Sequence, residues 1–260
     1  MTRHVLLVGE SWISVANHYK GFDHFSSTTF HLGATEFVAE LEKEGDFAVT
    51  YMKAHEVADG FPFERSGLDG YDAIILSDIG ANSFLLPGGV WLQGRPMPDR
   101  LKLIRDWTAD GGGLMMVGGY LTFQGIDAKA RWHRTPVEAA LPVTCLPFDD
   151  RIEVPEGFSA EIAQPDHPIL TDIAGDWPPL LGANEIMARD GAEVIARLPE
   201  ACGGHPLLVT GRFGRGRTLA WASDIGPHWL PETFSAWDGA GPLWRNMLKW
   251  LSGDLGEAAP

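Results

Sequence analysis

Short apolar runs alternate with amphipathic segments through the first half of the chain. The runs have the length of strands and are bounded by glycine or polar turn residues, which is typical of buried parallel strands. The segments between them repeat apolar residues at helical spacing, as Phe37, Val38 and Leu41 do. We therefore expect strands at 4–9, 47–52, 71–77 and 111–118, and helices at 34–43 and 99–109.

Two segments of the first half lack a clear pattern. A long loop through Asn17, Lys20, Asp23 and His31 is expected to join the first strand to the first helix. The second segment, 80–98, is rich in proline and glycine and is expected to be irregular. A loop of that length inside a domain is usually functional or part of an interface.

The second half changes character. Residues 142–180 are rich in proline and acidic residues, and short apolar runs at 142–146 and 152–154 indicate loops and edge strands over one end of the domain. Three further strands are expected at 192–198, 206–212 and 217–223, and a closing helix at 242–251. The last two strands form a predicted hairpin, because the Gly-Arg-Gly between them allows the positive φ angles of a tight turn.

This order of elements predicts the fold class. Strands that alternate with helices form right-handed βαβ units, which place helices on both faces of a mainly parallel sheet. We expect a three-layer, doubly wound α/β domain over residues 1–252 with a C-terminal β-hairpin, followed by a tail at 253–260.

Charge and composition narrow the classes of partner. The chain has 20 Lys and Arg against 35 Asp and Glu, a formal net charge of -15, which repels nucleic acid and anionic membrane surfaces. It contains no apolar leader and no run long enough to span a membrane, so a cytoplasmic protein is expected. Cys145 and Cys202 are expected to stay reduced there.

The turn after the strand at 111–118 is the most informative motif. In hydrolases and amidotransferases of this architecture, a Ser or Cys nucleophile occupies the sharp turn at the carboxyl edge of the sheet. Here that turn reads Gly118, Gly119, Tyr120. No nucleophile is present, and we expect the two glycines to expose backbone N–H groups to a polar ligand.

Several motifs in order resemble one known family. They are Gly-Glu-Ser-Trp at 9–12, Ser-Asp at 77–78, Gly-Gly-Gly-Leu-Met-Met-Val-Gly-Gly-Tyr at 111–120, Gly-Arg-Gly-Arg-Thr-Leu-Ala-Trp-Ala-Ser-Asp-Ile-Gly-Pro-His-Trp at 214–229, and a Trp-rich terminal helix. Together, over about residues 3–252, they resemble the glutamine amidotransferase-like family, which is related to the ThuA-like trehalose-utilisation proteins. The resemblance implies a flavodoxin-like, class I glutamine amidotransferase-like fold.

The resemblance is weaker for activity. Working amidotransferases of this class carry a Cys on the turn and a later His-x-Glu. His228 falls where the catalytic His would be, but Trp229, Leu230, Pro231 and Glu232 follow it. Cys145 and Cys202 do not match the nucleophile motif, so glutamine hydrolysis is disfavoured.

Polar residues at the carboxyl ends of the predicted strands define a candidate site. We expect catalysis, if any, to use His228 with Glu10 or Asp78, because a His and a carboxyl pair can do acid and base work. The expected ligand-binding residues are Ser11, Trp12, Asn82, Gly118, Gly119, Tyr120, Arg131, Trp132 and Asp224. Each also has a structural reading: the glycines could serve only packing, His228 could be a hydrogen-bonded core residue, Asp78 could cap a helix and Arg131 could form an internal salt bridge.

No cofactor or metal is expected. The grouping of His18, Asp23, His24 and His31 matches no structural zinc signature, and the chain has no phosphate-binding or dinucleotide motif.

Three functions remain open from the sequence. The leading one is a small-molecule protein that binds a polar ligand, sugar-derived or carboxylated, with possible hydrolase or isomerase chemistry. The second is a non-catalytic homo-oligomeric module, in which Trp91, Trp229, Trp237 and the 80–98 loop make subunit contacts. The third, disfavoured, is a glutaminase that uses Cys145 or Cys202.

Overall fold

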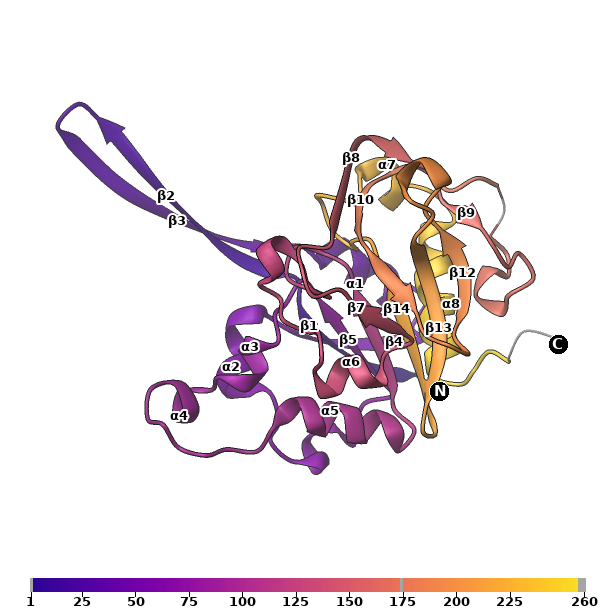
Figure 1. The fold of residues 1–260 in the computed structure, drawn as a ribbon, viewed down its shortest axis with the longest axis horizontal. Coiled ribbons are helices and arrows are strands. Elements are labelled where there is room, and N and C mark those ends of the chain that lie inside the picture. Colours follow the sequence, from indigo (N-terminus) through magenta and orange to yellow (C-terminus); the bar gives the residue numbers. More distant parts are fainter. Residues whose placement is uncertain (1, 174, 257–260) are drawn as a thin grey trace.

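A computed structural model describes residues 2–173 and 175–256. Within these residues, one eight-stranded sheet has the strand order β4-β1-β5-β6-β14-β13-β12-β9 (Figure 1). Its strands are β1 (Arg3–Gly9), β4 (Phe47–Met52), β5 (Ala73–Ser77), β6 (Gly113–Val117), β9 (Glu161–Ile162), β12 (Glu193–Arg197), β13 (Pro206–Phe213) and β14 (Gly216–Trp221). The five strands from β4 to β14 run parallel to one another, and β13, β12 and β9 continue the sheet antiparallel.

The helices flank this sheet in two groups. Helix α1 (Thr35–Glu42) packs against α8 (Ala240–Leu251), where Arg245 pairs with Glu40 and Phe37 meets the ring of Trp244 edge-on. Helix α5 (Arg100–Ala109) packs against α6 (Pro136–Ala140). The mainly parallel α/β fold and its C-terminal hairpin are as predicted.

Shorter elements connect and cover the sheet. They are α2 (Val57–Gly60), α3 (Asn82–Leu85), α4 (Gly88–Trp91), α7 (Glu232–Ser235), the pair β8 (Arg151–Phe158) with β10 (Leu180–Asn184), the pair β7 (Val143–Cys145) with β11 (Ile186–Ala188), and 3₁₀ turns at Ala54–Glu56, Arg65–Leu68, Ile126–Ala128, Pro168–Leu170 and Glu200–Cys202. The 80–98 loop thus contains two single-turn helices. No helix in the described part of the chain combines the length and apolar character that a bilayer crossing requires.

The loop expected after the first strand is instead a long hairpin. Strands β2 (Ser11–Lys20) and β3 (Asp23–Leu32) pair antiparallel over ten residues each. The turn places Gly21 at its first central position with φ of 65°, as type II′ hairpins require. The prediction failed because these strands lack the alternation of apolar and polar residues that burial on one face imposes.

The expected tail also needs correction at its beginning. Asp254 forms an ion pair with Arg3, and the carbonyl oxygen of Leu255 accepts a hydrogen bond of 2.8 Å from Arg217. Residues 253–255 therefore pack on the domain, whereas 257–260 lie outside the described residues.

The strand order fixes where a ligand can bind. From β1 the chain crosses to β4 on one side and then to β5 on the other, so the carboxyl ends of β1 and β5 form the topological switch point. Open α/β sheets bind ligands in the crevice at this point. Glu10 follows β1 and Asp78 follows β5.

Close backbone packing beside this crevice requires a glycine after β6. A Cβ on Gly118 would lie 2.1 Å from the carbonyl oxygen of Ala222, and the main chain between two central strands cannot yield. We predict that Gly118→Ala lowers the free energy of unfolding by about 2–4 kcal/mol. Gly70→Ala is the matched control, because no neighbouring atom lies within 4 Å of its Cβ, and denaturant unfolding should show it near neutral. Equal stability of the two variants would contradict this account.

Candidate functional site

Two carboxyl groups enter the crevice from strained positions. Glu10 and Asp78 adopt left-handed backbone conformations, with φ of 44° and 41°. This conformation is costly for residues other than glycine and is concentrated at functional sites. The N–H of Glu10 donates to the carbonyl oxygen of Ser77 at 2.7 Å, so the ends of β1 and β5 are tied together where both side chains emerge.

The Glu10 side chain is almost completely buried. Ser77 Oγ donates to Glu10 Oε2 at 2.6 Å. Two glycines make room for the carboxyl group: a Cβ on Gly33 would lie 2.4 Å from Oε1, and one on Gly226 would lie 3.0 Å from it. The surrounding chain is therefore shaped around a carboxyl group.

Asp224 and His228 reach the same crevice from the segment that follows β14. Asp224 Oδ1 accepts hydrogen bonds from the N–H groups of Ile225 and Gly226, at 2.7 and 3.1 Å. Its second oxygen, Oδ2, lies 3.3 Å from His228 Nδ1. This contact orients the imidazole, as a carboxylate does for a general base.

An open pocket of about 380 Å³ lies above these groups. Glu10, Asp78, Asp224 and His228 supply its polar atoms, and its remaining lining residues are Trp12, Tyr120, Leu121, Ile126 and Pro227. The Tyr120 ring meets the imidazole of His228 edge-on, with centroids 4.0 Å apart. Polar chemistry at the bottom and apolar walls above are the features of a small-molecule site.

The glycine turn does not offer the free N–H groups that the sequence led us to expect. The N–H of Gly118 donates to the carbonyl oxygen of Trp221 at 2.7 Å, and that of Gly119 donates to Asn184 Oδ1 at 3.0 Å. Gly119 instead makes space, because a Cβ there would lie 2.8 Å from Asp78 Oδ1. Asp78 Oδ1 accepts a hydrogen bond of 2.7 Å from the N–H of Leu121.

A buried polar clasp from the second half of the chain holds this turn. Asn184 Nδ2 donates to Asp150 Oδ1 at 2.8 Å, and the Asp150 carboxylate accepts the N–H groups of Gln124 and Gly125, both at 2.8 Å. Neither Asp150 nor Asn184 was predicted from the sequence. Their only signal was a polar residue beside a short apolar run, which is common in loops.

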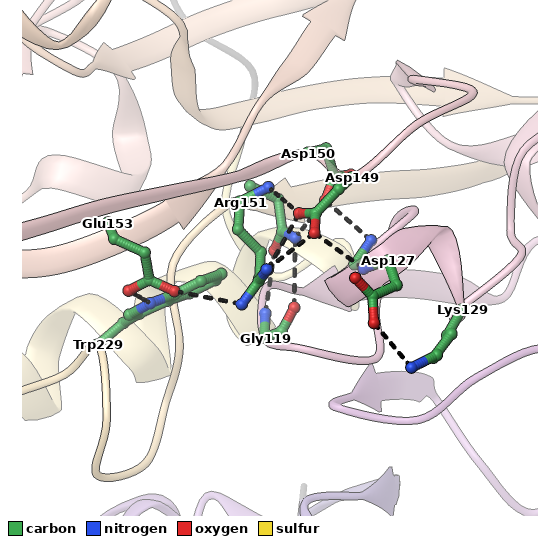
Figure 2. Close-up of polar contacts among 10 residues, drawn as sticks. Gly119, Asp127, Lys129, Asp149, Asp150, Arg151, Glu153 and Trp229 are labelled. Carbon is green, nitrogen blue, oxygen red and sulfur yellow. Dashed lines mark hydrogen bonds and ion pairs between the residues drawn. The ribbon is translucent and has the colours of Figure 1, made fainter.

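Arg151 extends the clasp to the rim of the pocket. Figure 2 shows its guanidinium between Asp149 and Glu153, with a hydrogen bond of 2.8 Å to Asp149. The guanidinium also lies over the Tyr120 ring, 5.0 Å from its centroid. Trp229 Nε1 donates to Glu153 at 3.0 Å, which fixes the indole on which His228 stacks. Trp229 is almost completely buried and lies behind His228 without lining the pocket, so it is not available for the subunit contact of the assembly alternative.

Burial and mutual repulsion favour the protonated forms of the carboxyl cluster. Burial raises the pKa of Glu10 well above its usual range, and the negative charges of Asp224 and Asp78 raise it further. Burial and the charge of Asp78 do the same to the pKa of Asp224, and burial raises the pKa of Asp78. Burial lowers the pKa of His228, so its imidazole is neutral at physiological pH.

Six residues expected at the site do not line the pocket: Gly118 and Gly119, described above, and Ser11, Asn82, Arg131 and Trp132. Ser11 Oγ accepts a hydrogen bond from the N–H of Ala54, and Asn82 is exposed at the start of α3. Arg131 is exposed, with φ of 62°. Trp132 is completely buried and donates from Nε1 to the carbonyl oxygen of Ile79 at 2.9 Å, so it is a core residue and not a platform for a ligand.

Comparison with known proteins places the whole chain in one family. The family model described as "Putative glutamine amidotransferase" matches residues 4–253. The chain belongs to this family. No curated protein matches it.

Solved structures that are similar in sequence or fold support this assignment. The cytoplasmic protein STM3548 from Salmonella typhimurium is 40% identical, with a TM-score of 0.90 over 95% of this chain and 98% of that one. The cytoplasmic protein STM1381 from Salmonella typhimurium LT2 is 41% identical, with a TM-score of 0.89 over 95% and 99%. A "putative thua-like protein" from Parabacteroides merdae shares the fold at 10% identity, with a TM-score of 0.60 over 98% and 91%.

This member of the glutamine amidotransferase-like family has no thiol in its pocket. Cys145 is buried in β7, where burial and the charges of Glu138 and Asp150 raise the pKa of its thiol well above the usual range. Cys202 lies in a 3₁₀ turn and does not line the pocket. Over residues 2–173 and 175–256, no three His, Cys, Asp or Glu side chains are grouped to hold a metal ion.

The raised pKa of Glu10 predicts a pH dependence of stability. Above its ordinary pKa of 4.5 the unfolded chain releases this proton and the folded chain keeps it, so folding stability falls as pH rises. Glu10→Gln keeps the shape without the ionisation. We predict that its unfolding free energy relative to wild type improves with pH, by about 1–3 kcal/mol between acidic and mildly alkaline pH.

Denaturant unfolding across this pH range measures the effect. Glu36→Gln, at an exposed position of α1, is the control and should follow the wild-type curve. A difference between Glu10→Gln and wild type that does not change with pH would rule out a retained proton.

Proposed function

We propose that the pocket binds a neutral, polyhydroxylated, sugar-like molecule and that His228 and Asp78 act on it as base and acid. The observation that carries this proposal is the cluster of three carboxyl groups, two of them almost completely buried, under one neutral imidazole. A site that concentrates titratable groups with shifted pKa values at a switch point is a strong candidate for acid–base chemistry.

The chemistry of the pocket favours hydroxyl groups over anions. Carboxyl groups that retain protons both donate and accept hydrogen bonds, which suits a ligand rich in hydroxyls. Any member of the cluster that ionises repels a carboxylate or phosphate, so of the two ligand types considered from sequence we retain the sugar-derived one. The faces of Trp12 and Tyr120 supply the apolar surface on which a sugar ring can stack.

We assign the roles of the four polar residues by their depth in the pocket. His228 and Asp78 border the open part of the pocket, whereas Glu10 and Asp224 are almost completely buried beneath them. His228 would take a proton from a water molecule or from a carbon beside a carbonyl, and Asp78 would give one to the departing or carbonyl oxygen. These two cases correspond to a hydrolase and an isomerase. Glu10 and Asp224 would be positioning residues that set the charge of the cluster.

Glutamine hydrolysis is not part of this proposal. The turn carries no nucleophile, and neither cysteine lines the pocket. We further propose that the protein works in the cytoplasm without a nucleic-acid or membrane partner, as its net charge of -15 and the names of its Salmonella relatives suggest.

A thermal-shift screen tests the proposed ligand. Aldoses, ketoses, sugar alcohols and sugar acids are compared on wild type, Asp78→Asn and His228→Ala. We expect at least one neutral sugar to raise the wild-type melting temperature, since a ligand at 100 times its Kd adds about 2.7 kcal/mol to stability. Both variants should lose most of this gain.

Two comparisons keep the screen interpretable. His205→Ala, which removes a partly exposed histidine outside the pocket, should respond like wild type. A response to sugar acids alone, or one that both pocket variants keep, would contradict the proposal. For any ligand found, NMR of the mixture tests for turnover, which His228→Ala should abolish.

A further inference from the structure

The β2–β3 hairpin, residues 11–32, is an arm that leaves the body of the protein. In Figure 1 its outer part extends away from every other element. Only its base touches the domain, where Phe30 meets the ring of His55 edge-on and Ser11 bonds to Ala54. The remaining side chains of both strands are exposed almost without exception.

The arm makes too few side-chain contacts to be stable on its own. Its side-chain contacts are stacked pairs such as Trp12 with His31 and His18 with Phe25, with centroids 4.9 and 4.6 Å apart. A two-stranded ribbon with no covered face is marginal in water. Both of its outer edges also present unpaired backbone groups, which pair readily with another strand.

The composition of the arm is that of an interface. Lys20 and Asp23 are its only charged residues, so its formal charge is zero while the rest of the chain carries all of the -15. Its five large aromatic residues are all exposed: Trp12, Tyr19, Phe22, Phe25 and Phe30. The cores of protein interfaces are enriched in aromatic residues and depleted of charged ones. Because the arm is neutral, a second copy of this acidic chain can approach it without the repulsion that the rest of the surface exerts.

We propose that the arm binds the arm of a second copy of this chain, antiparallel about a two-fold axis through its middle. The exposed fractions of its five aromatics run from 39% for Trp12 to 108% for Phe22. With aromatic areas of about 150–250 Å² each, they offer roughly 500–800 Å² per arm. Trp12 and Phe25 lie on one face of the ribbon, and Tyr19 and Phe30 lie on the other. With the aliphatic residues, both faces of two arms together carry surface of the order of the 1,200–2,000 Å² that a stable interface buries.

This geometry brings the partner copy to the pocket. Ten residues at about 3.4 Å each make the arm about 34 Å long, and antiparallel pairing over that length sets the tip of one arm beside the base of the other. Trp12, at the base, lines the pocket. The partner's Tyr19 and Phe22 would therefore cover the open side of the pocket. This second step rests on the proposed function, whereas the dimer does not.

Light scattering during size-exclusion chromatography tests the dimer. Wild type should show twice the chain mass of 28.4 kDa over a concentration series. Val15→Asp, in the middle of the arm, and Phe22→Asp, at its tip, should weaken dimerisation by roughly 30-fold or more. Leu92→Asp is the matched control, since Leu92 is 77% exposed outside the arm, and it should remain dimeric.

Cross-linking gives a second readout that does not depend on the stability of the aspartate variants. Ala16 and Ser27 face each other at the middle of the hairpin, so whichever edge pairs with the partner brings one of them near its own copy. In a Cys202→Ser background, Ala16→Cys or Ser27→Cys should form a disulfide-linked dimer, and Leu92→Cys should not. A monomeric wild type, or a dimer that Leu92→Asp dissociates while both arm variants leave it intact, overturns the proposal.

The role at the pocket has its own test. With a sugar found by the screen above, Phe22→Asp should weaken the thermal shift although its own pocket residues are intact. If it is monomeric and responds like wild type, the pocket step is wrong and the dimer stands. If no sugar binds any variant, the proposed function fails and the mass measurements still decide the dimer.

Discussion

The crowding of three carboxyl groups at one sheet edge, with Glu10 and Asp224 almost completely buried, is the constraint on which the rest of the site depends. An ionised carboxylate in so apolar a position is unstable unless it is paired, protonated or hydrogen-bonded. Hydrogen bonds and raised pKa values both stabilise these groups. Ser77 donates to Glu10, backbone N–H groups donate to Asp224, and the raised pKa values favour protonated carboxyls. Glycines at 33 and 226 are then required because any side chain would displace the Glu10 carboxyl. An arrangement that costs stability is retained where it serves binding or chemistry.

The turn that carries the nucleophile in related enzymes has a different task here. Its two glycines bring the backbone close to Ala222 and leave space for Asp78, and the clasp of Asn184 and Asp150 uses its polar groups. The turn thus supports a carboxyl group supplied by the neighbouring strand. In the function that we propose, the reactive groups lie at the ends of β1 and β5 and not on the turn after β6, so the family fold would be kept with a different chemistry.

Much of this could be predicted from the sequence, and the failures have physical causes. Buried parallel strands are continuous apolar runs, so their ends could be located, and with them Glu10, Asp78, Asp224 and His228. Trp132 was misplaced because an indole is equally suited to a core and to a ligand, and only the path of the chain decides. The clasp joins residues that are 25 to 65 positions apart, which no local pattern reveals. The arm was missed because it is a strand pair without a buried face.

The net charge of the chain and the position of Trp12 relate the arm to the carboxyl cluster. Copies that each carry a formal charge of -15 repel one another. Association through the body would bring these charges together, whereas the proposed pairing of uncharged arms of about 34 Å would hold two bodies apart while burying aromatic surface. Because Trp12 belongs to both the arm and the pocket wall, any partner that orders the arm also fixes one wall of the site. Assembly and ligand binding should therefore stabilise each other through the side chain of Trp12. A binding function and an assembly function are thus compatible in one structure.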